Sequence, residues 1–241
     1  EVRPTLFCGV PRVFEKFYSE LTQAVASKGP IAQALLFKAL DLSKNSEQGS
    51  QLSPNKPGLK SLYRQGFCWA LSKTLGRRME KALGGRIRIV ISGGAPLSQE
   101  IGWFFKNLGL EILEGYGLTE SAAATCVGRP DLTQVGSVGL PLPGTEIRIG
   151  DDGEVLIRGP GLMSGYWKDS KATKESFHKG WLKTGDIGEI DDGGELKITG
   201  RKKEIIVTAS GKNVSPQNIE KRFRAHPLLA DVVVHGDRRK Y

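Results

Sequence analysis

The sequence predicts an α/β fold: a parallel sheet with packed helices, then a β-rich, barrel-like part, then the start of a small α+β domain. Three observations predict it. Helix-like and strand-like apolar patterns alternate up to residue 124, hairpin signals dominate residues 125–200, and strand and helix patterns alternate again from residue 201. The 241 residues are long enough to bury a core, and the 31 glycines imply many turns.

The first 85 residues are mainly helical in pattern. Apolar residues fall on one helical stripe from Pro11 to Ala26, and a second helix is expected at Ile31–Leu42. Lys44–Pro57 is rich in Ser, Asn, Gln, Gly and Pro, which indicates an exposed loop. A third helical stretch, Leu59–Leu83, follows. These helices are interpreted as packing elements.

A strand–helix–strand unit comes next. The alternation from Arg86 to Ile91 predicts a strand, and Ser98–Leu108 has helical spacing, with Ser98 as the expected N-cap and Gly109 as the terminator. Leu110–Leu113 is the next strand-like run. Right-handed crossover makes the two strands parallel, so the loops that follow them open at the same edge of the sheet.

The two loops after these strands carry ligand-binding residue types. Gly93 and Gly94 in the segment SGGAPL let a flat ring approach the backbone. The segment EGYGLTESAAA offers a ring, a hydroxyl and a carboxylate in Tyr116, Thr119 and Glu120. The alternative is that the glycines only turn the chain and that Thr119 and Glu120 begin an exposed helix.

The β-rich part contains two hairpin signals. Glu146–Ile149 and Val155–Arg158 flank the turn sequence DDG, and Gly188–Ile190 and Leu196–Thr199 flank DDGG. The last part of the chain is expected to contain a strand, a turn, a helix that begins at Ser215-Pro216 with Ile219 and Phe223 on one face, and a second strand. The strands are Glu204–Val207 and Asp231–Val234, and the turn is Ala209–Lys212.

The charge is uneven along the chain. The formal net charge is +9, but residues 111–199 are net acidic between two basic flanks. Basic flanks suit polyphosphate ligands and anionic lipid surfaces at least as well as nucleic acid, and solvated helix faces are the plainer alternative. No basic stripe interleaved with aromatic residues supports a nucleic-acid partner.

Cysteine spacing and hydropathy indicate the cellular compartment in which the protein is expected. Cys8, Cys68 and Cys126 lie far apart, which argues against a disulfide framework and a zinc site. A reducing compartment follows, so the expected location is the cytoplasm, with peripheral contact at a membrane surface left open. No run approaches the roughly 18 apolar residues of a membrane helix. The sequence does not indicate the oligomeric state.

Six segments in order carry a resemblance to a known family. They are SGGAPL, EGYGLTES, GSVGLPLPG, EVLIRGPGLMSGYW, GWLKTGDIG and GRKKEIIVTASGKNVSP. Together they resemble the adenylate-forming, or AMP-binding, superfamily, and the opening GVPRVFEKFY is most similar to its long-chain fatty acyl-CoA synthetase branch. The resemblance implies an acid–thiol ligase that uses ATP and Mg²⁺ to make an acyl-adenylate from a fatty acid and then transfers the acyl group to CoA.

The resemblance also implies roles for individual residues in nucleotide binding. Gly94, Ala95 and Pro96 match the adenine-site loop. Tyr116 matches the ring that lies against the base, with Gly115 and Gly117 allowing close approach.

Further matches concern the phosphate, the metal, the ribose and CoA. Thr119 matches the phosphate-contacting hydroxyl and Glu120 the Mg²⁺ ligand. Asp186 matches the carboxylate that binds both ribose hydroxyls, the alternative being a turn residue before Gly188, and Arg201 matches a second ribose contact. Lys203 lies at the interdomain hinge position, and Gly211 matches a glycine of the CoA channel.

The domain organisation implied by the resemblance has one boundary. Residues 1–200 correspond to the second half of the large AMP-binding domain, with 1–124 its α/β part and 125–200 its β-rich part; residues 201–241 are the hinge and a truncated small C-terminal domain. The family's phosphate loop and its adenylating lysine are expected before residue 1 and beyond Tyr241, and Lys240 is no substitute. We therefore expect an internal fragment that is nearly inactive by itself.

Two alternatives stay open at this stage. Within the family, the parent could pass its acyl group to an acyl carrier protein, or activate an aryl or medium-chain acid. In another class, the chain could be a non-catalytic nucleotide-binding module, which the missing phosphate loop and lysine would favour. The small residues Ser121 to Ala124 leave room for an alkyl chain but do not fix its length.

Overall fold

The computed structural model describes residues 2–27, 29–30, 34, 73, 76–130, 132–208, 213–224, 229 and 231–236. These residues divide into two compact units, 1–112 and 113–241. The predicted helix Ile31–Leu42, the loop Lys44–Pro57 and most of Leu59–Leu83 lie outside the described residues. None of the helices in the described parts of the chain is long and apolar enough to span a membrane.

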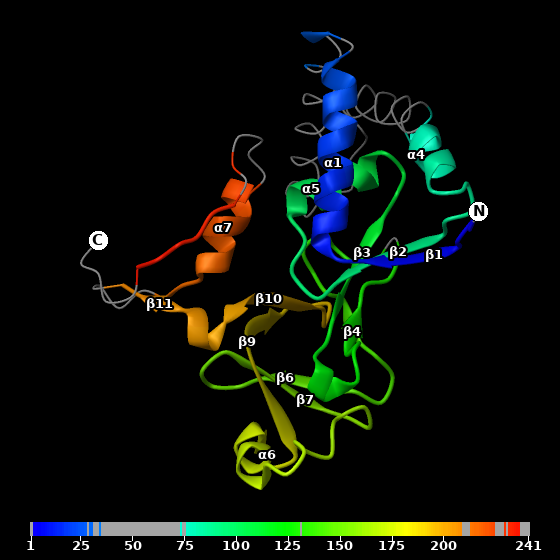
Figure 1. The fold of residues 1–241 in the computed structure, drawn as a ribbon. Helices are drawn as coiled ribbons and strands as arrows, with labels where there is room; N and C mark the ends of the chain where they lie inside the picture. Colours follow the sequence, from blue (N-terminus) through cyan, green and yellow to red (C-terminus); the bar gives the residue numbers. More distant parts are fainter. Residues whose placement is uncertain are drawn as a thin grey trace, which may run out of the picture. The chain divides into compact units, whose positions relative to one another are not determined.

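The first unit contains a parallel strand pair and the helices that pack near it (Figure 1). β1 (Leu6–Gly9) pairs with β2 (Ile89–Gly93), with Leu6 opposite Ile89. The helices are α1 (Pro11–Ala26), α4 (Arg77–Ala82) and α5 (Gln99–Asn107). The predicted strand at 86–91 is thus three residues too early, because only Ile89 onward is paired with β1.

Helix α1 has the predicted bounds. Proline is tolerated at the first helical position because its missing N–H would have no partner there, and Pro11 begins the helix. α5 also follows its prediction: Ser98 takes the extended N-cap conformation, although its side chain makes no capping hydrogen bond. Gly109, at φ +85°, ends the turn that follows, which is a conformation that glycine adopts without strain.

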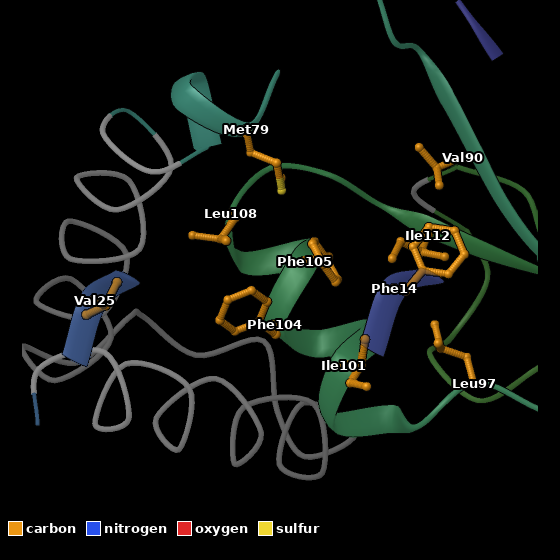
Figure 2. Packing of buried hydrophobic residues seen from close by; sticks show 10 residues of the cluster. All are labelled: Phe14, Val25, Met79, Val90, Leu97, Ile101, Phe104, Phe105, Leu108 and Ile112. Carbon is orange, nitrogen blue, oxygen red and sulfur yellow. The ribbon is translucent and has the colours of Figure 1, made fainter. Parts of the chain in front are cut away.

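Aromatic side chains from α1 and α5 form the core of the first unit (Figure 2). Phe14, Phe104 and Phe105 are each 1% exposed. The Phe14 and Phe105 rings lie 6.4 Å apart at 74°, and the Phe104 and Phe105 rings 5.2 Å apart at 86°, the edge-to-face arrangement that aromatic pairs favour. Truncating one such ring to alanine typically costs about 3–5 kcal/mol of stability.

The second unit begins with three short strands. β3 (Ile112–Tyr116) pairs antiparallel with β4 (Cys126–Val127), which pairs antiparallel with β5 (Leu140–Pro141). A short 3₁₀ helix, η2 (Thr119–Ser121), lies in the connection after β3. The predicted parallel pairing of β2 with the following strand crosses the boundary between the units and stays a prediction.

The β-rich part is an open antiparallel sheet in the order β10-β9-β7-β6, with β8 paired to β9 (Figure 1). Its strands are β6 (Glu146–Ile149), β7 (Glu154–Arg158), β8 (Phe177–His178), β9 (Trp181–Ile190) and β10 (Leu196–Arg201), and α6 (Ser170–Ser176) precedes β8. Both predicted hairpins are confirmed. The described strands form an open sheet and not a closed barrel, and the mixed α/β class is confirmed.

The last part of the chain departs from its prediction in two places. Glu204 ends a 3₁₀ helix, η3 (Lys202–Glu204), so the strand β11 is only Ile206–Val207, paired with β12 (Asn213–Val214). Residues 231–236 form no strand with any of the described residues, so the strand expected at Asp231–Val234 is not present there. Helix α7 (Pro216–Arg224) begins at the predicted proline, and Phe223 on it is 52% exposed.

Two glycines with the same backbone conformation differ in how closely their surroundings are packed. Gly139 and Gly180 have φ near +80°. A Cβ at Gly139 would lie 2.3 Å from the Val127 carbonyl oxygen, whereas a Cβ at Gly180 would meet no atom within 4 Å. We expect Gly180→Ala to cost about 1 kcal/mol through backbone strain, and Gly139→Ala at least about 2 kcal/mol more through the clash. Urea denaturation measures both, and equal losses would contradict the packing described.

Candidate functional site

Asp186 is the centre of the polar cluster in the second unit. It lies within β9 and is 2% exposed, so the alternative interpretation of a turn residue is wrong. Its Oδ2 accepts a hydrogen bond of 2.7 Å from the Tyr116 hydroxyl, and its Oδ1 lies 2.9 Å from Nε of Arg201. Arg201 stands directly opposite Asp186 in the β9–β10 ladder. The hairpin β9–β10 and the distant strand β3 therefore supply one carboxylate and its two partners.

Burial dominates the electrostatics of this cluster. Desolvation raises the pKa of Asp186, although the hydrogen bond from Tyr116 and the charge of Arg201 act to lower it. Desolvation also raises the pKa of Tyr116, and the Asp186 charge raises it further, so this hydroxyl remains a donor. The Arg201 side chain is half exposed, so one edge of the cluster meets solvent.

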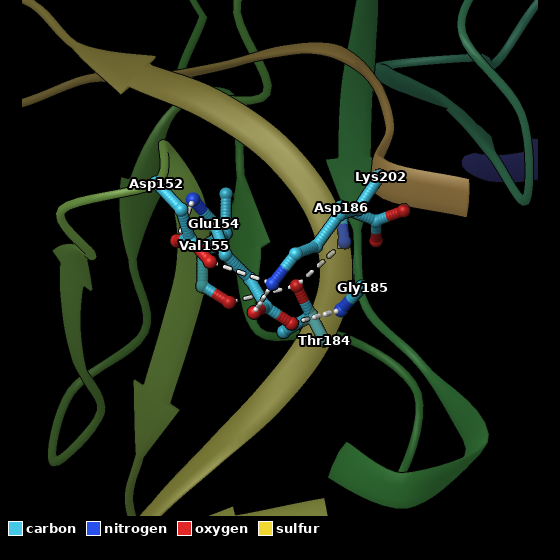
Figure 3. Close-up of polar contacts among 7 residues, drawn as sticks. All are labelled: Asp152, Glu154, Val155, Thr184, Gly185, Asp186 and Lys202. Atoms are coloured by element: carbon cyan, nitrogen blue, oxygen red, sulfur yellow. Dashed lines mark hydrogen bonds and ion pairs between the residues drawn. The ribbon is translucent and has the colours of Figure 1, made fainter. Parts of the chain in front are cut away.

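A second layer of polar contacts supports the backbone around Asp186 (Figure 3). The Gly185 N–H donates to Oε1 of Glu154 at 2.9 Å, and the Asp186 N–H donates to Oγ1 of Thr184 at 3.0 Å. Oε2 of Glu154 lies 2.9 Å from Nζ of Lys202. The same ammonium lies 2.6 Å from Oδ2 of Asp152.

The loop after β3 is fixed by its own backbone. A Cβ at Gly117 would lie 1.4 Å from the Ala123 carbonyl oxygen, so only glycine fits there. Gly117 is therefore required by a contact inside the loop, whatever ligand approaches it. Ala122 and Ala123 both have positive φ, 54° and 82°, which is unusual for residues with a side chain. Thr119 is exposed at the surface of this turn.

Glu120 projects from the same turn and has an aromatic partner. The Tyr166 hydroxyl donates to its Oε1 at 2.8 Å, which raises the pKa of Tyr166. No group of three or more His, Cys, Asp or Glu side chains among the described residues could hold a metal ion. A single carboxylate still fits Mg²⁺, because that ion usually binds to one or two carboxylates together with water and substrate phosphates.

The remaining predicted site residues lie elsewhere. Gly94, Ala95 and Pro96 are exposed in the first unit, in the loop after β2, where Gly94 has φ +82°. Gly211 lies outside the described residues. Gly115 is half-buried in β3 beside Tyr116. The structure thus brings Tyr116, Asp186 and Arg201 together.

Sequence reasoning missed four supporting residues: Glu154, Thr184, Lys202 and Tyr166. Thr184 stands two residues before Asp186 in the motif that was singled out, so its β-strand spacing was a usable signal. The others act across sequence separations of 31 to 48 residues, which no local pattern reveals. The fold and this site define an α/β protein with a buried, paired carboxylate next to an exposed cation.

Comparison with protein families identifies the family to which this chain belongs. Residues 1–167 match the family described as AMP-binding enzyme, and residues 203–241 match the AMP-binding enzyme C-terminal domain. The first match covers more than half of the chain, so the chain belongs to the AMP-binding enzyme family. The resemblance inferred from the six segments is confirmed.

Curated relatives match nearly the whole chain. Long-chain-fatty-acid–CoA ligase FadD15 of Mycobacterium bovis is 44% identical over 241 residues, covering 99% of this chain and 39% of the relative. Long chain acyl-CoA synthetase 5 of Arabidopsis thaliana is 35% identical over 252 residues, covering 98% and 36%. The chain therefore spans less than half the length of these relatives.

A solved structure shares the fold. O-succinylbenzoate coenzyme A synthetase (MenE) of Bacillus subtilis, in complex with ATP and a magnesium ion, is 29% identical and superposes with a TM-score of 0.60. The match covers 73% of this chain and 38% of that one. The likeness supports the α/β assignment for the part of the chain that it covers.

Two aspartates should shift stability with pH in opposite directions. Asp186 has a raised pKa in the folded protein, so the folded state binds more protons between the ordinary and the raised value, and stability falls as pH rises through that window. Asp152 has a lowered pKa because Lys202 donates to it, so its contribution is present above the ordinary value and is lost as pH falls.

Urea denaturation from about pH 3 to pH 7 should reveal the contrast. Relative to wild type, Asp186→Asn is expected to gain stability as pH rises, and Asp152→Asn to lose it. Parallel pH curves for Asp186→Asn and wild type would show that burial does not raise the pKa of Asp186.

Proposed function

We propose that the protein containing this chain is a long-chain fatty acid–CoA ligase. The observation that carries the proposal is the match to curated long-chain ligases along 98–99% of the chain, at up to 44% identity. In the first half-reaction a fatty-acid carboxylate oxygen bonds to the α-phosphorus of ATP and pyrophosphate leaves. In the second, the CoA thiol bonds to the acyl carbon, loses its proton, and AMP leaves.

Asp186 is assigned to the ribose of ATP. Each carboxylate oxygen can accept more than one hydrogen bond, so the contacts from Tyr116 and Arg201 leave acceptor capacity for two ribose hydroxyls. Those two contacts also fix the orientation of the carboxylate before the nucleotide arrives. Arg201 is assigned as a second ribose contact and the Tyr116 ring as the surface against the base.

Glu120 is assigned as the protein ligand of Mg²⁺, with Thr119 contacting a phosphate. The Tyr166 hydroxyl occupies only one of the two carboxylate oxygens among the contacts described, which supports this role. When bound with ATP, the ion neutralises phosphate charge as pyrophosphate leaves. Gly94, Ala95 and Pro96 are assigned to the adenine and Gly211 to CoA.

The domain boundary near residue 200 is part of the same proposal. A match to the AMP-binding enzyme C-terminal domain from residue 203 supports it. Lys203 then lies at the junction, where a hinge has only to absorb a backbone rotation. Parallel assays with CoA and with acyl carrier protein decide which of the two accepts the acyl group. Contact with a membrane surface does not follow from this assignment.

Fatty-acid-dependent exchange of labelled pyrophosphate into ATP tests the site in the full-length protein. Asp186→Ala and Glu120→Ala should each reduce exchange by roughly 10²-fold or more, because the first removes the carboxylate assigned to two ribose hydroxyls and the second removes the ligand assigned to the ion that would neutralise phosphate charge. Glu146→Ala, which removes an exposed carboxylate of the same unit, is the control and should leave the rate unchanged.

The outcomes distinguish a wrong assignment of the site residues from a wrong assignment of the activity. Normal exchange in both variants would overturn the site assignment. Absence of exchange in the wild-type protein with every acid supplied would overturn the ligase function and favour a nucleotide-binding module.

Two tyrosines should affect different ligands. Tyr116→Phe keeps the ring but removes the hydrogen bond to Asp186, so the KM for ATP should rise roughly tenfold, as expected for a hydrogen bond to a charged group. Tyr166→Phe removes the hydrogen bond to Glu120, so a higher Mg²⁺ concentration should be needed for half-maximal exchange. Titrations of ATP and of Mg²⁺ on both variants measure this, and identical changes in the two would contradict separate roles.

A further inference from the structure

An irregularity in the sheet determines where Asp186 lies. Between the paired residues Glu154–Ile187 and Leu156–Lys183, three residues of β9 face the single residue Val155 of β7. β9 therefore bulges at Thr184–Asp186, and Gly185 takes a left-handed conformation there with φ +73°. Bulges of this kind re-aim a side chain and leave backbone groups without ladder partners.

Side chains replace the missing ladder partners of the bulge. The Gly185 N–H donates to Glu154 at 2.9 Å, while Thr184 Oγ1 donates to the Val155 carbonyl at 2.7 Å and accepts from the Asp186 N–H at 3.0 Å. Figure 3 shows these contacts converging on the backbone at Gly185 and Asp186. Glu154 is thus the acceptor that fixes the residue immediately before Asp186.

Glu154 is itself buried, at 6% exposure, and depends on Lys202 for charge compensation. The ammonium of Lys202 lies 2.9 Å from Oε2 of Glu154. A buried carboxylate without a cation is unfavourable and tends to move toward water or take up a proton. Lys202 immediately follows Arg201, so adjacent residues compensate Asp186 and Glu154.

We propose that Glu154 and Lys202 are a positioning pair for the nucleotide site, in which Lys202 holds Glu154 and Glu154 holds the bulge that orients Asp186. The proposal rests on the assignment of Asp186 to the nucleotide. Lys202 begins η3, the segment that leaves the sheet after β10. Withdrawal of η3 from the sheet therefore loosens Asp186, which couples nucleotide affinity to the conformation of the segment that leads to the C-terminal domain.

AMP binding to the full-length protein, measured by calorimetry, tests the pair apart from turnover. Lys202→Met removes the cation and leaves Glu154 uncompensated, so the Kd for AMP should rise about tenfold. Glu154→Gln keeps an acceptor for the Gly185 N–H and removes the charge that needs Lys202, so its Kd should rise no more than about threefold.

The double variant gives the decisive comparison. The neutral amide introduced by Glu154→Gln no longer requires a cation, so Glu154→Gln combined with Lys202→Met should bind AMP within about twofold of Glu154→Gln alone. If Lys202 instead contacted the nucleotide itself, the double variant would bind at least as weakly as Lys202→Met. That result overturns the proposal.

Controls keep the outcomes apart. Lys202→Arg keeps a positive charge beside Glu154 and should bind AMP more tightly than Lys202→Met, and Lys183→Met, which removes an exposed lysine of β9, should have no effect. If Lys202→Met fails to fold, the comparison of Glu154→Gln with the double variant still tests whether Lys202 acts only through the charge of Glu154. Loss of AMP binding in Asp186→Ala with unchanged binding in Lys202→Met refutes the pair alone. Unchanged binding in Asp186→Ala refutes the nucleotide site.

Discussion

The polar site of the second unit depends on keeping the Asp186 carboxylate in a place that excludes water. Burial disfavours the charged form of this carboxylate, whereas a hydroxyl from β3 and a guanidinium from β10 stabilise it. The bulge in β9 turns the side chain toward both groups. The opposing effects do not cancel, because burial still raises the pKa of Asp186. This carboxylate is held at some expense of stability, as functional groups often are.

Buried apolar residues stabilise the unit that carries this site and offset the cost of burying the carboxylate. In the second unit Cys126, Val155, Ile157 and Leu196 are at most 1% exposed and pack under the strands that carry the site. On β7, Val155 and Ile157 join this core, whereas Glu154 and Arg158 on the opposite face of the strand make ion pairs with Lys202 and Glu146.

Local patterns predicted much of the fold and less of the site. The helix Pro11–Ala26 and both hairpins followed directly from periodicity and turn residues, because these signals act over a few positions. The strand expected at Asp231–Val234 was wrong, since this run pairs with none of the described residues and β propensity alone does not supply a partner strand. Helical spacing predicted the face that Ile219 and Phe223 share, but it could not predict that Phe223 is 52% exposed.

The sequence by itself determined the family and the mixed α/β class, and it singled out Tyr116, Asp186 and Arg201, because ordered motifs and strand periods are present along the chain. Only the tertiary structure decided which side chains support them. Tyr116 and Asp186 are 70 residues apart, and Glu154 and Lys202 are 48 apart. The packing of elements that lie far apart in the sequence brings these partners within hydrogen-bonding distance, and which elements meet, and in what register, is a property of the fold that no local pattern encodes.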